Sequence, residues 1–278
     1  MRLSPFLLIL LLLTPALAGT TARERHPGAL PDHRLARGAN VIAEAWLADP
    51  TDRYRHFVLG ARYEAASLKV RLRDGRLLTL TLPPESVFED RLPRLADLDG
   101  DGRDEIVLVR SHKTRGAALV VIAIRDGRLG IIAETPPTGR ANTWLNPAGI
   151  ADFDGDGRLD VAYVQMPHAL GRLRLWTFDG SRLREIARVD DTSNHIIGSR
   201  HLGLAAVADF DGDGVADLAV PSFDRRSLRF LSFRGGVREI ARKRLPAAAA
   251  ADFAVERHGS RAVVVVGLAG GRTVKIRP

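Results

Sequence analysis

Short apolar runs separated by tight polar turns make up most of the chain beyond residue 40. Turns that contain Asp-Gly or Gly-Gly lie between two apolar runs and recur after 52, 53 and 56 residues, at 73–76, 125–128, 178–181 and 234–237. Such a turn between apolar runs is a strong hairpin signal. Valine, isoleucine, leucine and threonine dominate the runs and few segments have a helical period, so the pattern predicts antiparallel β-strands.

These strands group into repeats of four. In the third repeat we expect strands at 145–151, 160–165, 172–178 and 182–188. Small apolar residues in the first strand and bulkier ones in the second are typical of propeller blades. Two degenerate copies, at 45–52 and 250–253, bring the number of repeats to five. The sequence therefore predicts an all-β fold, a β-propeller with five blades of four antiparallel strands.

The last repeat ends with the strand at 273–276 and is one strand short. Residues 19–40 precede the first repeat without a blade of their own, so we expect this N-terminal segment to supply the missing outer strand. Such closure would hide the sheet edges that an open array exposes. The predicted domains are therefore the closing segment at 19–40 and the propeller at 41–278.

One nine-residue acidic pattern occurs three times, at 97–105, 152–160 and 209–217. Carboxylates at positions 1, 3, 5 and 9 and the backbone carbonyl of position 7 would form the oxygen shell of about six to eight ligands that Ca²⁺ prefers. Glycines at positions 4 and 6 allow the backbone to turn through left-handed conformations. We predict up to three calcium ions, linked to folding because they neutralise crowded acids. The predicted ligands are Asp97, Asp99, Asp101, Arg103, Glu105, Asp152, Asp154, Asp156, Arg158, Asp160, Asp209, Asp211, Asp213, Val215 and Asp217.

The acidic loops have two other interpretations. An EF-hand needs a bidentate Glu at position 12, whereas these loops have Leu108, Tyr163 and Val220 there and strands follow them. A solvated acidic turn without an ion is the remaining alternative for each loop. Even where calcium binds, its role can be structural and distant from the surface that carries the activity.

The loop Asp-Phe-Asp-Gly-Asp-Gly-x-x-Asp followed by a β-strand resembles the FG-GAP/VCBS repeat of integrin α-subunit propellers and of many exported bacterial proteins. The resemblance covers roughly residues 40 to 278, strongly in three units and faintly in two. It implies a calcium-bearing β-propeller used for adhesion or for contact with carbohydrate or protein, and occasionally a scaffold for a lyase. The first loop departs from the pattern because Glu105 replaces the ninth-position Asp.

The first 18 residues have the pattern of a signal peptide. A basic start precedes an apolar run at 6–13, and Ala16-Leu17-Ala18 is a small-residue cleavage site. The run is shorter than the roughly 20 residues of a spanning helix, which disfavours the alternative of a retained membrane anchor. We therefore predict cleavage after Ala18, no membrane span in the mature protein, and a periplasmic or secreted location. The chain has no cysteine, so we expect the calcium loops, and not disulfides, to stabilise the exported fold.

The longest irregular segments are expected together at the end of the sheets opposite the acidic loops. They are at 111–115, 138–146, 192–201 and 223–226. Long loops on a rigid scaffold often carry binding residues. We expect Trp144 on this surface, so that its replacement by Ala affects binding and leaves stability nearly intact; packing of Trp144 under its own loop is the alternative. The candidate ligand-binding residues are Arg140, Asn142, Trp144, Asn146, His195, Arg200 and His201.

Charge and the absence of catalytic motifs favour a binding protein. The chain has 41 Lys and Arg against 33 Asp and Glu, and outside the acidic loops the excess of bases is larger. A basic exported protein suits an anionic polysaccharide, another glycan, or an envelope or extracellular protein, and nucleic acid is not expected. No nucleophile elbow, zinc helix or phosphate loop is present, so we name no catalytic residue. We predict a monomeric, non-enzymatic interaction module; the alternative is a polysaccharide lyase or hydrolase with its site at the propeller channel.

Overall fold

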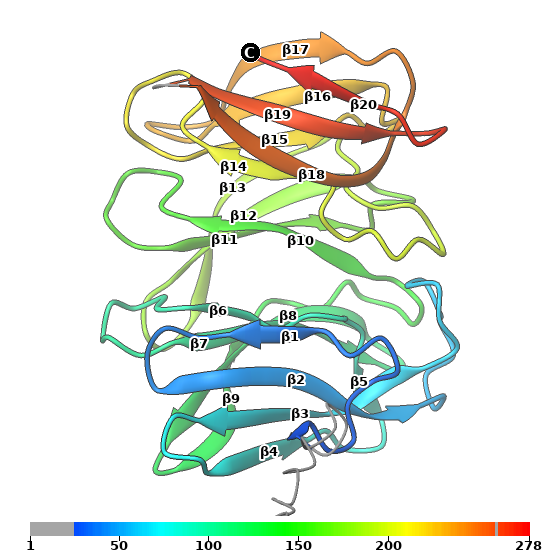
Figure 1. Cartoon of the computed structure of the whole chain (residues 1–278), viewed down its shortest axis with the longest axis vertical. Helices are drawn as coiled ribbons and strands as arrows, with labels where there is room; N and C mark the ends of the chain where they lie inside the picture. The colour runs from blue at the N-terminus through cyan, green and yellow to red at the C-terminus, as the bar shows by residue number, and fades with distance from the viewer. Residues whose placement is uncertain (1–24, 259–260) are drawn as a thin grey trace, which may run out of the picture.

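The computed structural model describes residues 25–258 and 261–278, and the elements assigned in them are all β-strands (Figure 1). The all-β prediction is therefore confirmed. Residues 1–18, the expected signal peptide, lie outside the described residues. In the described part of the chain, no helix has the length and apolar character needed to cross a membrane.

The first two repeats share one nine-stranded sheet, in which β5 pairs with both β3 and β7. All pairings in this sheet are antiparallel. Its strands are β1 (Leu35–Arg37), β2 (Ile42–Thr51), β3 (Glu64–Leu72), β4 (Leu77–Thr81), β5 (Ser86–Phe88), β6 (Arg94–Ala96), β7 (Glu105–His112), β8 (Gly116–Arg125) and β9 (Arg128–Glu134).

Three separate antiparallel sheets follow, in strict chain order. The third repeat is β10 (Leu145–Ala151), β11 (Asp160–Gln165), β12 (Arg172–Phe178) and β13 (Leu183–Val189), and the fourth is β14 (Ala206–Ala208), β15 (Asp217–Pro221), β16 (Ser227–Ser232) and β17 (Arg238–Arg244). The last sheet has three strands, β18 (Ala249–His258), β19 (Arg261–Leu268) and β20 (Thr273–Ile276). The strands expected in the third repeat are thus confirmed to within one residue.

Hydrophobic clusters join each repeat to the next. One cluster packs β2, β3 and β4 against β7, β8 and β9, and three further clusters join the second, third, fourth and last repeats in turn. Position 2 of each acidic loop contributes to them: Leu98 and Phe153 are fully buried, and Phe210 packs at the edge of the last cluster. Burial of such a side chain stabilises the fold by about 1.5–3 kcal/mol, so the apolar core holds each acidic loop in place.

The innermost strands lie close together around one cavity of about 460 Å³. It is lined by residues that lie in the four sheets or in the segments leading into them, among them Arg34, Arg94, Pro147, Leu202 and Asp252. The first and last repeats otherwise lie at opposite ends of the long axis in Figure 1. Gly149 in β10 permits the close approach of neighbouring inner strands, because a Cβ there would lie 2.5 Å from Val207.

Two expectations about the degenerate repeats are wrong. β1 pairs with β2, while β20 pairs only with β19 among the described strands. The N-terminal segment therefore begins the first sheet and does not complete the last one, because residues 35–37 pair with the adjacent strand at 42–51. Residues 45–51 lie in the second strand, β2, so the degenerate copy at 45–52 is not the first strand of a repeat with its acidic loop.

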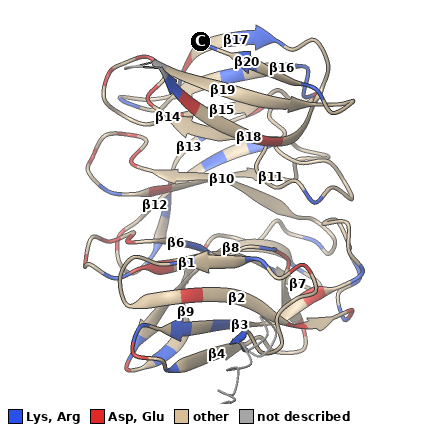
Figure 2. Cartoon of the chain, in the orientation of Figure 1, with Lys and Arg blue, Asp and Glu red and all other residues tan. Residues whose placement is uncertain are grey.

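Because successive strands are antiparallel, their connections alternate between the two ends of each sheet. The three acidic loops follow β6, β10 and β14, and they project from the left side of the molecule in Figures 1 and 2. The connections after β2, β9, β11 and β13 emerge at the other end. The predicted separation of the acidic loops from the longer connections is therefore confirmed by the strand order.

Candidate metal-binding loops and an opposing pocket

The three acidic loops share three types of internal hydrogen bond. The carboxylate at position 1 accepts the N–H of the position 6 glycine, position 3 accepts from position 5, and position 5 accepts from position 7. The position 1 bonds are Gly102 to Asp97 at 2.9 Å, Gly157 to Asp152 at 2.9 Å and Gly214 to Asp209 at 3.0 Å. In the first loop, the amides of Asp101 and Arg103 donate to the carboxylates of Asp99 and Asp101. In the second loop, the amides of Asp156 and Arg158 donate to Asp154 and Asp156. In the third loop, the amides of Asp213 and Val215 donate to Asp211 and Asp213. One sequence pattern thus gives the same three types of hydrogen bond in each loop.

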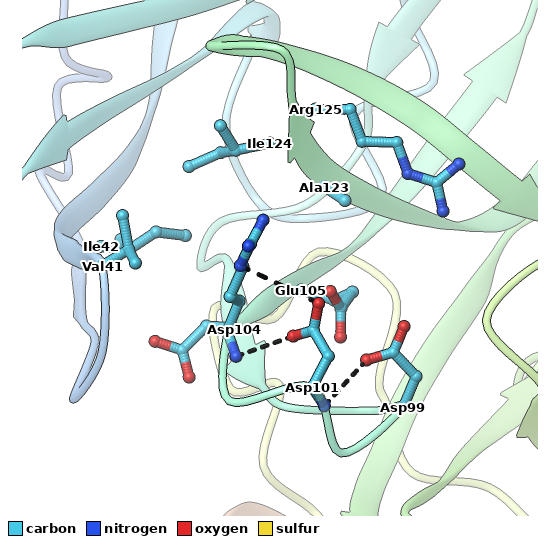
Figure 3. A pocket seen from close by; sticks show the side chains of 10 residues that line it. Val41, Ile42, Asp99, Asp101, Asp104, Glu105, Ala123, Ile124 and Arg125 are labelled. Atoms are coloured by element: carbon cyan, nitrogen blue, oxygen red, sulfur yellow. Dashed lines mark hydrogen bonds and ion pairs between the residues drawn. The ribbon is translucent and has the colours of Figure 1, made fainter.

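The acid at position 9 begins the next strand and is buried beneath the loop. Glu105, Asp160 and Asp217 each accept the backbone N–H of position 2, at 2.9, 3.1 and 2.8 Å. Glu105 makes this bond despite its longer side chain, which in Figure 3 is directed toward the Asp99 and Asp101 carboxylates. The loop is therefore anchored at its base by a carboxylate in all three copies.

Each loop gathers three carboxylates whose oxygens lie within 4.8 Å of one another. Two oxygens that bind one Ca²⁺ at about 2.4 Å can be at most about 4.8 Å apart, so these spacings suit a shared cation. The groups are Asp97, Asp99 and Asp101; Asp152, Asp154 and Asp160; and Asp209, Asp211 and Asp217. The described carboxylates of Glu105, Asp156 and Asp213 lie outside these groups.

A buried carboxylate oxygen in each loop has no hydrogen-bond partner among the described residues. These atoms are Oδ1 of Asp97, Asp160 and Asp217. A buried acceptor without a donor costs free energy, and a cation would satisfy it. The donor set is entirely hard oxygen, so the residues fit calcium better than a transition metal.

Burial also makes the negative charge at position 9 unfavourable. It raises the pKa of Glu105 to about 7, that of Asp160 to about 7 and that of Asp217 to about 6, and the neighbouring aspartates add to each shift. The loops therefore hold more negative charge than the protein compensates. A divalent ion would supply that compensation.

The third loop differs because arginines from the β16–β17 hairpin reach it. Arg238 Nη2 lies 2.5 Å from Asp211 Oδ2, and Arg234 Nη1 lies 3.4 Å from Asp213 Oδ2. A guanidinium on a carboxylate competes with a metal for that oxygen. In the first loop the nearby Arg125 instead donates to the backbone carbonyl of Gly180, and the loop borders a cavity of about 350 Å³.

At the opposite end, the structure divides the predicted ligand-binding residues. Arg140 and Asn142 are exposed and line one pocket together with Trp144. Trp144 is only 2% exposed, and its Nε1 donates to the Glu89 carbonyl oxygen at 2.8 Å. The expectation of an exposed Trp144 is therefore wrong, because its indole fills the core between the second and third repeats.

The other four predicted residues do not line this pocket. Asn146 is buried and donates to the carbonyl oxygens of Asn194 and Leu202, which ties the β13–β14 connection to β10. His195 is buried behind the pocket wall. His201 lies 3.0 Å from Asp252, and the backbone carbonyl of Arg200 accepts from Arg34.

The pocket, of about 290 Å³, also contains residues that the sequence did not single out. His56 and Val58 come from the connection after β2, Met166 and His168 from the connection after β11, and Ile197 from the connection after β13. His56 is held by Glu89, which is fully buried. Sequence patterns could not find this site because its residues come from four connections separated by up to 141 positions, from His56 to Ile197.

Two neutral histidines stabilise one wall of the pocket: His168 lines the pocket, and His195 is buried behind His168. Burial lowers the pKa of His168 to about 3 and that of His195 to about 4. His195 Nε2 lies 3.1 Å from the Ser199 carbonyl oxygen, which only accepts, so Nε2 carries the proton. His195 Nδ1 then accepts from His168 Nε2, 2.9 Å away, and the lone pair of His168 is on Nδ1.

This wall should make the protein sensitive to acid. A histidine in the unfolded chain binds a proton near pH 6.5, whereas His168 and His195 resist protonation in the folded protein. The free energy of unfolding of the protein therefore decreases as the pH falls from about 7 toward 4. We expect the loss of unfolding free energy between pH 7 and pH 5 to be smaller in His168→Gln than in the wild type, by on the order of 1 kcal/mol after allowance for solvent screening. Urea unfolding at both pH values measures it. His112→Gln, outside the pocket, is the control; an equal acid loss in the wild type and His168→Gln would contradict the assignment.

Comparison with known proteins identifies the repeats. Residues 97–163 and 152–220 match the model of the FG-GAP-like repeat, so this part of the chain belongs to the FG-GAP repeat family, as its acidic loops predicted. No curated protein matches the sequence significantly.

Solved structures show distant similarity. The crystal structure of BBS1N in complex with ARL6DN is 11% identical, with a TM-score of 0.44, over 77% of this chain and 60% of that one. The rhamnogalacturonan lyase YesW is 15% identical, with a TM-score of 0.43, over 77% of this chain and 51% of that one. The chain thus spans less than two thirds of the length of either protein.

Proposed function

The chain carries FG-GAP-like repeats, and on that premise we propose that it is an exported, calcium-stabilised interaction module. Its five repeats would be the blades of a propeller, with an N-terminal signal peptide directing the protein to the periplasm or the exterior. The observation that carries the proposal is that each of the three acidic loops gathers three carboxylates and holds one buried carboxylate oxygen that lacks a donor. Calcium at these loops would stiffen one end of the sheets and leave the other end for a ligand.

The end opposite the loops supports a role in binding. Four connections from three repeats converge there on a pocket with polar and apolar walls, which is how rigid folds usually present a ligand site. The chain has a formal net charge of +8, which favours anionic partners in an extracellular setting. We propose an acidic glycan as the ligand and a monomeric, non-enzymatic protein as the binder.

Retention on immobilised polysaccharides tests this function. With calcium present, the full chain should be retained on hyaluronate, which carries a carboxylate on every second sugar, and should pass through a column of neutral dextran. Excess chelator should reduce retention on hyaluronate, because the loops would lose the ions that order the scaffold. Equal behaviour on the two polymers would contradict an acidic glycan as the ligand, and retention unchanged by chelator would contradict a calcium-dependent scaffold.

A further inference from the structure

A buried carboxylate positions one histidine of the pocket. Glu89 Oε1 lies 2.6 Å from His56 Nδ1, and Glu89 Oε2 accepts from the Ser111 hydroxyl. The backbone carbonyl oxygen of Glu89 accepts from Trp144 Nε1. Every oxygen of Glu89 is therefore occupied, and the His56 ring is fixed with Nδ1 toward the core and 19% of its side chain exposed in the pocket.

His56 and Glu89 act as a single acid–base unit whose accessible atom is His56 Nε2. One proton lies between Nδ1 and Oε1, and when the pair holds only that proton, Nε2 has a lone pair and accepts. When the pair gains a second proton, Nε2 carries it and donates. This holds whichever heavy atom keeps the first proton. Protonation therefore converts the pocket face of His56 into a charged donor.

The groups around this unit favour a negative ligand. Arg140 stands at the rim of the pocket, and Arg225 is close enough to His168 and His195 to help lower both of their pKa values. Positive charge thus reaches the histidines at the pocket wall. The negative charge of Glu89 is buried, and its oxygens are already hydrogen-bonded. The titratable and charged groups that face or surround His56 are Tyr54, Glu64, Glu89, Arg91, Arg140 and His168.

The pocket has the size and walls for one sugar. Its volume of about 290 Å³ is near the lower limit for small-molecule sites. Val58, Met166 and Ile197 provide apolar surface, and the Ile197 side chain is 69% exposed although it is aliphatic. A pyranose ring has an apolar C–H face that suits such a wall, while its substituents require polar partners.

We propose that this pocket binds the carboxylate of a single sugar acid, with Arg140 and His56 as the charged donors and with uptake of one proton by the His56–Glu89 unit. The carboxylate would accept from the Arg140 guanidinium and from Nε2–H of His56, and the ring would lie against Ile197. This inference rests on the proposed function, since it gives the acidic glycan a binding site. The proposed site is a different cavity from the one of about 460 Å³ between the inner strands.

Calorimetry with D-glucuronate and its neutral twin D-glucose tests the pocket. With calcium-loaded full-length protein at pH 8, we expect D-glucuronate to bind and D-glucose not to bind. Measured in two buffers that differ in ionisation enthalpy, binding should show net uptake of protons. His56→Gln and Arg140→Gln should each weaken binding about tenfold or more, as expected when a charge-assisted hydrogen bond is lost. His56→Gln should also abolish proton uptake, which Arg140→Gln should keep.

Matched controls separate this site from the general basic surface. His201→Gln and Arg115→Gln change the same residue types outside the pocket and should bind D-glucuronate like the wild type. Arg140 is exposed, so Arg140→Gln remains a valid test if His56→Gln fails to fold. Wild-type affinity in Arg140→Gln, or no binding of D-glucuronate by the wild type, would overturn the proposal. Retention on hyaluronate that persists in both pocket variants would overturn this pocket alone, whereas D-glucuronate binding without hyaluronate retention would overturn the polysaccharide function alone.

Discussion

Removal of calcium should lower the melting temperature of the protein substantially. A ligand that binds only the folded state stabilises it by about 2.7 kcal/mol when its concentration is 100 times its dissociation constant. For a chain of this size, one such site raises the melting temperature by about 5–10 °C. Scanning calorimetry in saturating calcium and in excess chelator measures the difference. We expect the three loops to contribute, and the third to contribute least, because Arg238 and Arg234 already pair with its acids.

Removing one carboxylate of the second loop, in Asp160→Asn, should change the stability of the protein in opposite directions without and with calcium. In calcium-free protein near pH 8, Asp160 is a buried charge beside other acids, and its pKa is raised to about 7. A raised pKa means that the folded state loses stability as the pH rises from about 4 through 7. Asp160→Asn should therefore be neutral or stabilising in chelator. In saturating calcium it should be less stable than the wild type, because it loses a ligand.

Asp179→Asn is the matched control for that experiment. Asp179 lies in the exposed β12–β13 turn at the same end of the sheets and belongs to none of the three carboxylate groups. Its effect on stability should be the same with and without calcium. If Asp160→Asn also shifts the melting temperature equally in both conditions, the second loop does not bind calcium. An equal melting temperature of the wild type in saturating calcium and in excess chelator would contradict all three sites.

Replacement of Trp144 by Ala should destabilise the protein by about 3–5 kcal/mol, the usual cost of removing a large buried aromatic side chain. The indole is in the core that joins β7 and β8 to β11 and β12. It also stacks on His168, at 6.3 Å between ring centres and 15° between planes, and donates to the Glu89 carbonyl oxygen. Urea unfolding measures the loss. The expectation drawn from sequence, that this change spares stability, is reversed by the burial of the side chain.

Two variants separate the parts of this effect. Trp144→Phe keeps an aromatic ring but removes the Nε1 donor, so we expect a smaller loss, of about 1–3 kcal/mol from the buried carbonyl left unpaired. Asn142→Ala, two residues away and exposed, should be within about 0.5 kcal/mol of the wild type. A Trp144→Ala protein as stable as Asn142→Ala would show that the indole does not support the core in solution.

Local features of this protein were accessible from sequence because they depend on residues close together in the chain. The acidic pattern determined the three loops and their hydrogen bonds, since nine consecutive residues supply both the carboxylates and the turns. The order of antiparallel strands determined the separation of these loops from the longer connections. Short apolar runs bounded by polar turns determined the strands of the third repeat. The sequence misplaces the degenerate copy at 45–52, because without its glycines and acids nothing marks where an inner strand ends, and it assigns β1 to the wrong sheet. The degenerate copy at 250–253 does lie in the first strand of the last sheet, β18.

The pocket was decided by the tertiary structure alone. His56, Glu89, Trp144 and His168 come from different connections, and only the packing of neighbouring sheets brings them together. Sequence could place Trp144 on the correct connection but not determine which way its side chain turns, because burial depends on the space that the adjacent sheet leaves. Pairing of Glu89 with His56 likewise depends on a fully buried carboxylate that no local pattern distinguishes from a surface acid.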